Sequence, residues 1–206
     1  MRILPRLFLA AAMLTVSWGT ASSAQAADYT IDTAHSSLNF TVRHLATNVR
    51  GQFRTFEGAF TFDPSDLKRT SGTLTAETAS LDTNHGRRDE HLRSGDFFEV
   101  ETYPNMTYVF TGAKKKGKDY VIDGELTIRN VTKKVPLTVK QLGVMVDPWG
   151  NETTSFSGTA TLDRKDFGLN WNKALEAGGL MVGDEVKIEV NIAAHPKKDE
   201  EKEAKK

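Results

Sequence analysis

The chain has 206 residues, in which 27 Lys and Arg balance 27 Asp and Glu, and it has no cysteine. A balanced charge lacks the positive field that nucleic-acid binding or docking to anionic lipid requires, and the missing cysteines exclude disulfides and thiolate metal sites. This length is enough for one hydrophobic core, so we expect a single domain held together by that core alone.

The N-terminal residues predict a secretory leader. Arg2 and Arg6 form a positively charged start, and an apolar run from Leu7 to Trp18 follows. Ala24-Gln25-Ala26 then supplies small residues at a cleavage site. The apolar run is too short to cross a bilayer, which needs roughly 20 residues. We therefore expect residues 1–26 to be a cleaved signal peptide, the protein to be periplasmic, and no stable membrane anchor to remain.

Beyond the leader, apolar and polar residues alternate in short runs, as in Val186, Ile188 and Val190 with Lys187 and Glu189 between them. A period of two predicts strands with one dry and one wet face. The predicted strands cover about 36–44, 52–62, 72–81, 105–112, 119–129, 134–143, 153–163 and 185–194, and a short lead-in strand near Tyr29 and Ile31 is expected at the edge.

Two longer gaps interrupt this pattern. The first contains N-cap residue types at 82–84, an i,i+4 pair of Asp89 and Arg93, and then Gly95, which predicts a helix at about 86–94. The second predicts a short helical patch at about 171–176. The expected fold is all-β over residues 27–195, either a sandwich or an eight-stranded antiparallel up-and-down barrel whose ends both helical segments would cover. A charged, disordered tail is expected at 196–206.

The apolar strand faces are the candidate site. An eight-stranded barrel has an interior just wide enough for side chains or for one slender ligand, and the residues alone leave both options open. An outer-membrane barrel is disfavoured, because the aromatic residues lie mid-strand and the polar faces carry both charge signs. Glycines within the strands, at 58, 124 and 158, either leave space inside a barrel or mark bends that close it. The predicted ligand-binding residues are Phe40, Val42, His44, Phe56, Phe60, Tyr108, Phe110, Leu126, Ile128, Phe156 and Leu162.

The polar candidates each allow a structural and a functional interpretation. His44 is in phase with the apolar residues of its strand, so it is either a hydrogen-bonded histidine at the barrel rim or a contact to a lipid head group. The cluster at 87–93 suits phosphate through its arginines, but Asp89 and Glu90 favour a structural salt-bridge network. Arg164 and Asp166 are expected to bracket a strand end.

No catalytic constellation stands out. His85 and His91 are six residues apart, a spacing unsuited to a zinc pair on a helix, and the chain has no Gly-x-Ser-x-Gly elbow. We therefore predict no catalytic residue, no metal and no cofactor.

Four segments together resemble the YceI-like family of lipocalin-type polyisoprenoid-binding proteins: HSSLNFTVRH at 35–44, RDEHLRSGDFF at 88–98, GELTI at 124–128 and RKDFG at 164–168. The resemblance covers roughly residues 28 to 194 and implies an eight-stranded antiparallel lipocalin-like barrel. It implies a periplasmic binding protein, not an enzyme, that carries or sequesters a polyisoprenoid, a quinone tail or a fatty-chain lipid in an apolar tunnel. The alternatives are a lipid-modifying enzyme using His44 or His91, and a ligand-free, stress-related interaction module. A homodimer is left open.

Overall fold

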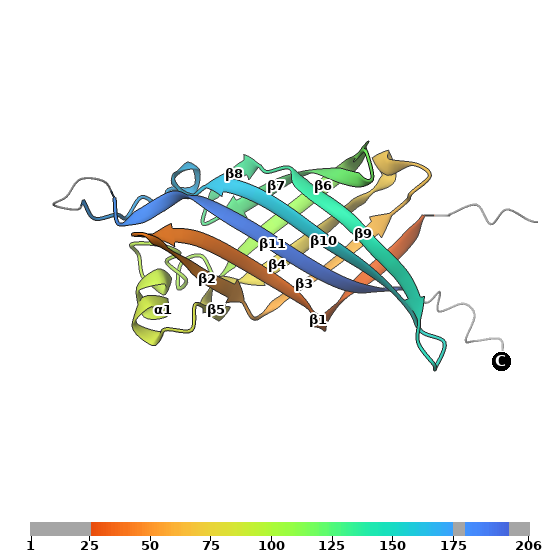
Figure 1. Ribbon diagram of the computed structural model, residues 1–206, viewed down its shortest axis with the longest axis horizontal. Helices are drawn as coiled ribbons and strands as arrows, with labels where there is room; N and C mark the ends of the chain where they lie inside the picture. The colour runs from red at the N-terminus through yellow and green to blue at the C-terminus, as the bar shows by residue number, and fades with distance from the viewer. Residues whose placement is uncertain (1–25, 175–179, 198–206) are drawn as a thin grey trace, which may run out of the picture.

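The computed structural model describes residues 26–174 and 180–197 (Figure 1). Its strands are β1 (Ala27–His44), β2 (Thr47–Phe53), β3 (Phe56–Phe62), β4 (Ser71–Glu77), β5 (Leu81–Asp82), β6 (Asn105–Lys116), β7 (Asp119–Ile128), β8 (Val131–Lys134), β9 (Leu137–Val146), β10 (Glu152–Asp163) and β11 (Val182–Pro196). The helical elements are α1 (Gly86–Arg93) and three 3-10 turns, η1 (Leu67–Arg69), η2 (Thr78–Ser80) and η3 (Arg164–Phe167). The predicted signal peptide, except its last residue, and the predicted tail beyond residue 197 lie outside the described residues.

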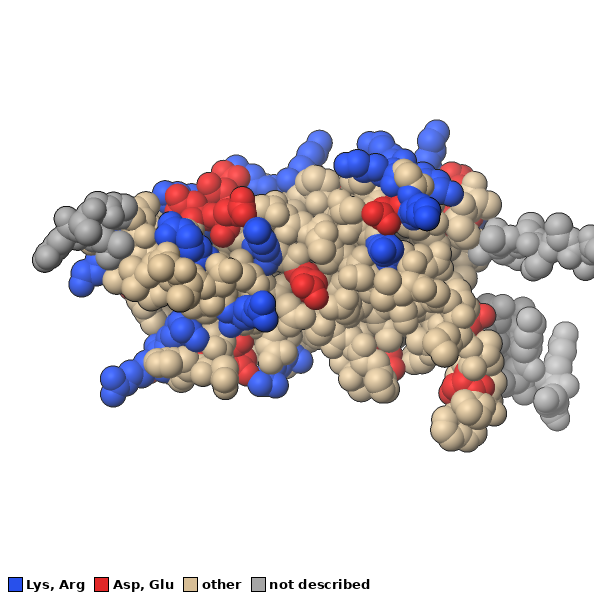
Figure 2. Space-filling model, viewed as in Figure 1, with Lys and Arg blue, Asp and Glu red and all other residues tan. Residues whose placement is uncertain are grey.

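The strands close into a barrel. Neighbouring strands run antiparallel in the order β11-β10-β9-β7-β6-β4-β3-β1, and β1 pairs again with β11, which closes a ring of eight strands. The apolar residues Ile188 and Val190 of β11 face inward, whereas Lys187 and Glu189 are exposed on the outer surface. Charged side chains of both signs are scattered over that surface (Figure 2). The predicted all-β, eight-stranded barrel is confirmed.

Two predicted strands are each split in the structure. The segment 52–62 divides into β2 and β3 because β1 bends at a bulge between Asp32 and Ser37: its first half pairs with β3 and its second half with β2. The lead-in strand is thus the first half of β1. The segment 134–143 divides into β8 and β9 at Pro136, which has no N–H to give to a sheet.

The helix α1 forms where the sequence predicts it, but its cap differs. His85 is the N-cap residue, and its Nδ1 accepts a hydrogen bond from the Arg88 N–H at 3.3 Å. The residues at 82–84 do not cap the helix, because Thr83 instead donates through its N–H and its hydroxyl to Asp89. The helix lies at one end of the barrel, next to β2 and β5 (Figure 1).

The second helical patch, predicted at 171–176, is wrong for the described residues 171–174, which have no helical structure. The helical turn in this gap is η3, which begins after Asp163 and ends at Gly168 in the left-handed conformation, with φ of 76°. Asn172 shows why the chain stays extended: its side chain accepts from the Val182 N–H at 3.0 Å and donates to the Val182 carbonyl at 2.7 Å, tying the segment to β11.

A polar cluster joins β1, β10 and β11 at the seam that closes the ring. His195 Nε2 lies 3.2 Å from Asp32 Oδ2, and His195 Nδ1 lies 3.0 Å from the Glu152 carbonyl oxygen. Because both ring nitrogens face acceptors, the doubly protonated imidazolium is favoured, and the hydrogen bond to the Glu152 carbonyl, aided by Asp32, raises the pKa of His195 above its usual 6.5. His35, bonded to Asp32 at 2.7 Å, and His195 lower the pKa of Asp32 below 3.8.

The seam should make stability depend on pH. The contribution of His195 is fully present below pH 6.5 and is lost as the pH rises through its raised folded pKa. The contribution of Asp32 is present above pH 3.8 and is lost as the pH falls through its lowered folded pKa. His195→Gln should therefore lower the urea midpoint more at about pH 5.5 than at about pH 9. A difference in urea midpoint between parent and variant that is the same at both pH values would contradict this.

Candidate ligand-binding cavity

The barrel encloses a cavity of about 510 Å³, a size typical of small-molecule binding sites. Its wall combines inward side chains of the ring strands with residues of α1, of the loop after α1 and of the segment around Trp171. Along β11 the wall runs from Val182 to Ile192. Ten residue steps at 3.3 Å, tilted by about 40°, make the cavity roughly 25 Å long, so it is narrow and elongated.

The structure places ten of the eleven predicted residues on this wall: Phe40, Val42, His44, Phe60, Tyr108, Phe110, Leu126, Ile128, Phe156 and Leu162. The exception is Phe56, which shares their face but is only 7% exposed and packs in a core cluster with Ala76 and Met106. Phe56 is enclosed by these neighbours and is not part of the cavity wall. The ligand contacts of the other ten stay a prediction.

Glycines allow the large rings to lie flat against the wall. A Cβ on Gly124 would lie 2.2 Å from Cζ of Tyr108, and one on Gly51 would lie 2.3 Å from Cζ of Phe40. The rings therefore occupy the space that these glycines leave on the neighbouring strands. Of the three strand glycines singled out from the sequence, Gly124 faces the Tyr108 ring, whereas Gly58 faces Ile31 and Gly158 faces Leu137.

Tyr108 is a neutral hydrogen-bond donor in this wall. Its hydroxyl donates to the Val135 carbonyl at 2.9 Å, and burial raises the pKa of Tyr108 well above its usual 10. A phenol in this state stays protonated at physiological pH. It fixes the ring against the wall and supplies no base.

Aromatic side chains gather at the α1 end of the cavity. The rings of His91, Phe97 and Trp171 lie within 5.4 Å of one another, centroid to centroid, and all three line the cavity. Nε2 of His91 is 2.9 Å from Asp96 Oδ2, which fixes the imidazole. Sequence alternation missed this group, because its members come from a helix and two loops. The adjacent Phe97 and Phe98 were the available signal.

Polar lining groups also lie at this end, among them His44, Arg88 and Arg164. Arg88 donates through Nε to the Thr83 hydroxyl and through Nη2 to the Thr83 carbonyl, both at 2.7 Å. Arg93 donates to the carbonyls of Ala79 and Leu81. The predicted salt-bridge network is therefore wrong in its chemistry: these arginines tie α1 to the strand edge through hydrogen bonds to Thr83 and to main-chain carbonyls, and Asp89 turns inward to Thr83.

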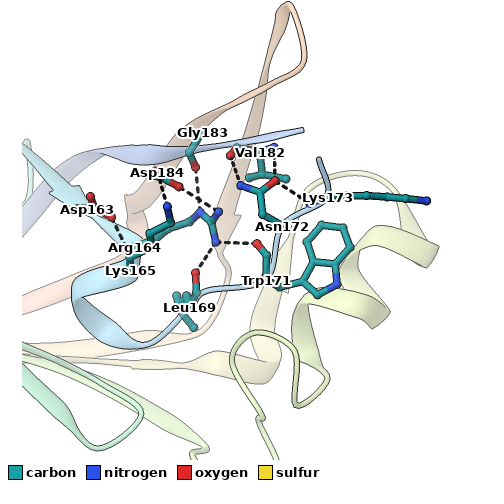
Figure 3. A network of polar contacts seen from close by, with 10 residues as sticks. All are labelled: Asp163, Arg164, Lys165, Leu169, Trp171, Asn172, Lys173, Val182, Gly183 and Asp184. Carbon is teal, nitrogen blue, oxygen red and sulfur yellow. Dashed lines mark hydrogen bonds and ion pairs between the residues drawn. The ribbon is translucent and has the colours of Figure 1, made fainter. Parts of the chain in front are cut away.

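Arg164 holds the segment after η3 against β11 (Figure 3). Its buried guanidinium donates to the carbonyls of Leu169, Trp171 and Gly183 and pairs with Asp184 at 3.2 Å. Arg164 does hold a strand end, as predicted, but its ion-pair partner is Asp184 and not the expected Asp166. Its buried position beside the cavity fixes where Trp171 lies.

Among the residues that the structure describes, no three His, Cys, Asp or Glu side chains are grouped so that they could bind a metal ion. In the same part of the chain, no helix has the length and apolar character needed to cross a membrane.

A closed, eight-stranded antiparallel barrel around an elongated apolar cavity defines a lipocalin-like barrel. The family model for the YceI-like domain matches residues 29–194, and the chain belongs to that family. A UPF0312 protein of Pseudomonas aeruginosa is 43% identical over 164 residues, covering 78% of this chain and 86% of that protein.

Solved structures show the same fold. BcnA of Burkholderia cenocepacia has a TM-score of 0.70 at 24% identity and covers 79% of this chain and 98% of its own. A polyisoprenoid binding domain from Saccharophagus degradans has a TM-score of 0.59 at 16% identity and covers 82% of this chain and 98% of its own. The barrel is thus retained where most of the sequence has changed.

Proposed function

We propose that this protein binds one long-chain isoprenoid or similar lipid in its barrel cavity and carries or sequesters it in the periplasm. The observation that carries the proposal is the elongated cavity, whose wall consists mainly of apolar side chains. A slender hydrocarbon chain fits such a space, and a polyisoprenoid binding domain has the same fold. The predicted signal peptide at residues 1–26 supports the periplasmic location.

The energetics suit a carrier. Burial of a CH₂ group from water is worth about 0.8 kcal/mol, but a long lipid starts from a membrane, which is as apolar as the barrel. Transfer between the two is therefore close to balanced, and small differences in fit and in head-group contacts set its direction. The donors at the α1 end, His44 and Arg88, are where we place the head group.

The fold shared with a polyisoprenoid binding domain supports binding over lipid-modifying catalysis. The enzyme alternative would use His44 or His91, which both line the cavity, and His91 is paired with Asp96 at 2.9 Å. Turnover of candidate lipids by the protein, abolished in His44→Ala or His91→Ala, would support the enzyme instead.

Native mass spectrometry of the protein isolated from a periplasmic extract tests the proposal. We expect one lipid mass per chain, released by organic extraction and identified from its fragments. The same spectrum reports whether the protein is a monomer or a homodimer. A chain that carries no lipid, and that takes none up from isoprenoid-containing vesicles, would overturn the proposal and favour a ligand-free interaction module.

A further inference from the structure

The hairpin formed by β9 and β10 projects from the barrel end opposite α1 (Figure 1). It carries most of the large apolar side chains that are exposed among the described residues. Their exposed fractions are 60% for Leu142, 52% for Val144, 76% for Met145, 65% for Val146 and 84% for Trp149. The tip is an uncharged surface with acidic side chains next to it (Figure 2).

At its tip, from Met145 to Thr153, this hairpin is a two-stranded ribbon, because β10 pairs with β11 only from Thr154 onward. In the part of the chain that the structure describes, β9 pairs with β7 only over Leu137–Val139, so its last residues have β10 as their one partner. Val144 pairs with Thr154 and Met145 with Thr153, so Val144 and Met145 point to opposite faces of the ribbon. Apolar side chains are therefore exposed on both faces.

The turn presents Trp149 on a fixed backbone. Asp147 Oδ1 accepts hydrogen bonds from the N–H groups of Trp149 at 2.9 Å and Asn151 at 2.8 Å, and Asp147 Oδ2 accepts from the Asn151 side chain at 2.9 Å. Gly150 has a φ of 84°, which the tight turn requires. Trp149 thus points into solvent from a turn that is already ordered.

We propose that this hairpin tip docks the protein onto an uncharged, zwitterionic lipid bilayer by inserting into the boundary between head groups and acyl chains. An apolar medium covers both faces of the ribbon at once, whereas a protein partner packed on one face leaves the other exposed. Tryptophan prefers that boundary, and β10 has only Glu152 and Thr153 beyond its last pairing with β11, too few for a membrane-spanning strand, which needs about 9–11 residues. The carboxylates of Asp147 and Glu152 disfavour an anionic surface.

The docking surface does not depend on the cargo, because its residues lie outside the cavity wall. A protein that binds vesicles but holds no lipid would contradict the cavity proposal alone. A protein that holds lipid but does not bind vesicles would contradict the hairpin proposal alone. Lipid content by mass spectrometry is therefore measured beside vesicle binding for every variant.

Co-flotation with phosphatidylcholine vesicles tests the proposal. The double variant Trp149→Ala, Met145→Ser should bind at least about tenfold more weakly than the parent, since two large apolar side chains no longer insert. The matched control is Val109→Ser, which removes an apolar side chain that is 43% exposed on β6, and it should bind like the parent. Adding phosphatidylglycerol to the vesicles should weaken binding.

Equal melting temperatures of parent and variants show that the fold is intact. The proposal is overturned if the parent does not float, if the double variant floats as well as the parent, or if phosphatidylglycerol strengthens binding. It is also overturned if the parent sediments as a dimer that the double variant dissociates, because a second copy would then cover the hairpin.

Discussion

Leu126→Trp is expected to empty the barrel of lipid while leaving it folded. Leu126 is partly buried on β7, lines the cavity and pairs with Tyr108 across the β6–β7 ladder. An indole at this position fills space that a hydrocarbon chain would occupy. Retained lipid per protein, measured by native mass spectrometry, should fall at least about tenfold, equivalent to about 1.4 kcal/mol.

The neighbouring residue supplies the control. Glu125 is exposed on the outer face of the same strand, so Glu125→Trp adds the same ring outside the cavity. It should keep the parent's lipid content. Stability of Leu126→Trp should change by less than about 1.5 kcal/mol, because the added ring enters open space. Full lipid content in Leu126→Trp would show that the lipid lies elsewhere.

Arg164→Leu is expected to cost about 3–5 kcal/mol of the free energy of unfolding. Arg164 is 3% exposed, and its guanidinium bonds three main-chain carbonyls and Asp184. The three carbonyls would lose this donor, whereas Asp184 keeps Lys165. Urea denaturation measures the loss. If Arg164→Leu does not fold, Arg164→Lys is the second variant. It keeps the positive charge but lacks the several N–H donors of the guanidinium, so its free energy of unfolding must still be clearly lower than that of the parent.

Lys165→Ala is the matched control for Arg164. Lys165 reaches the same Asp184 at 2.8 Å, but its side chain is 41% exposed. Its removal should cost less than about 1 kcal/mol. Equal losses at the two positions would mean that burial of Arg164 contributes nothing.

The barrel was predictable because alternation is a local signal. Alternate residues of a strand face the same side, so the apolar positions of each run, as in β11, predict which side chains face inward. Ten wall residues were predicted in this way. Phe56 shows its limit: the inward direction does not tell whether an inward ring meets a cavity or filled core, since that depends on neighbours distant in sequence such as Met106.

The ends of the barrel were less predictable, because they are built from contacts between distant segments. Arg164 pairs with Asp184 rather than with its neighbour Asp166, and Trp171 meets His91 only after the barrel has closed. Composition at 171–176 suggested a helix, but the bonds of Asn172 to Val182 hold the described part extended. The break at Pro136, by contrast, had a local signal that the alternation pattern did not use.

The ring is closed by the first and last strands of the domain, with Tyr29 opposite Pro196. A pairing between residues so distant in sequence has the largest loop-closure entropy cost. The contacts that offset this cost cannot form until the final strand is available. Every earlier strand can pair with its neighbour as the chain lengthens, but the interior stays open on one side throughout. The native topology therefore has a high contact order, and completion of β11 is the step that converts an open sheet into a container.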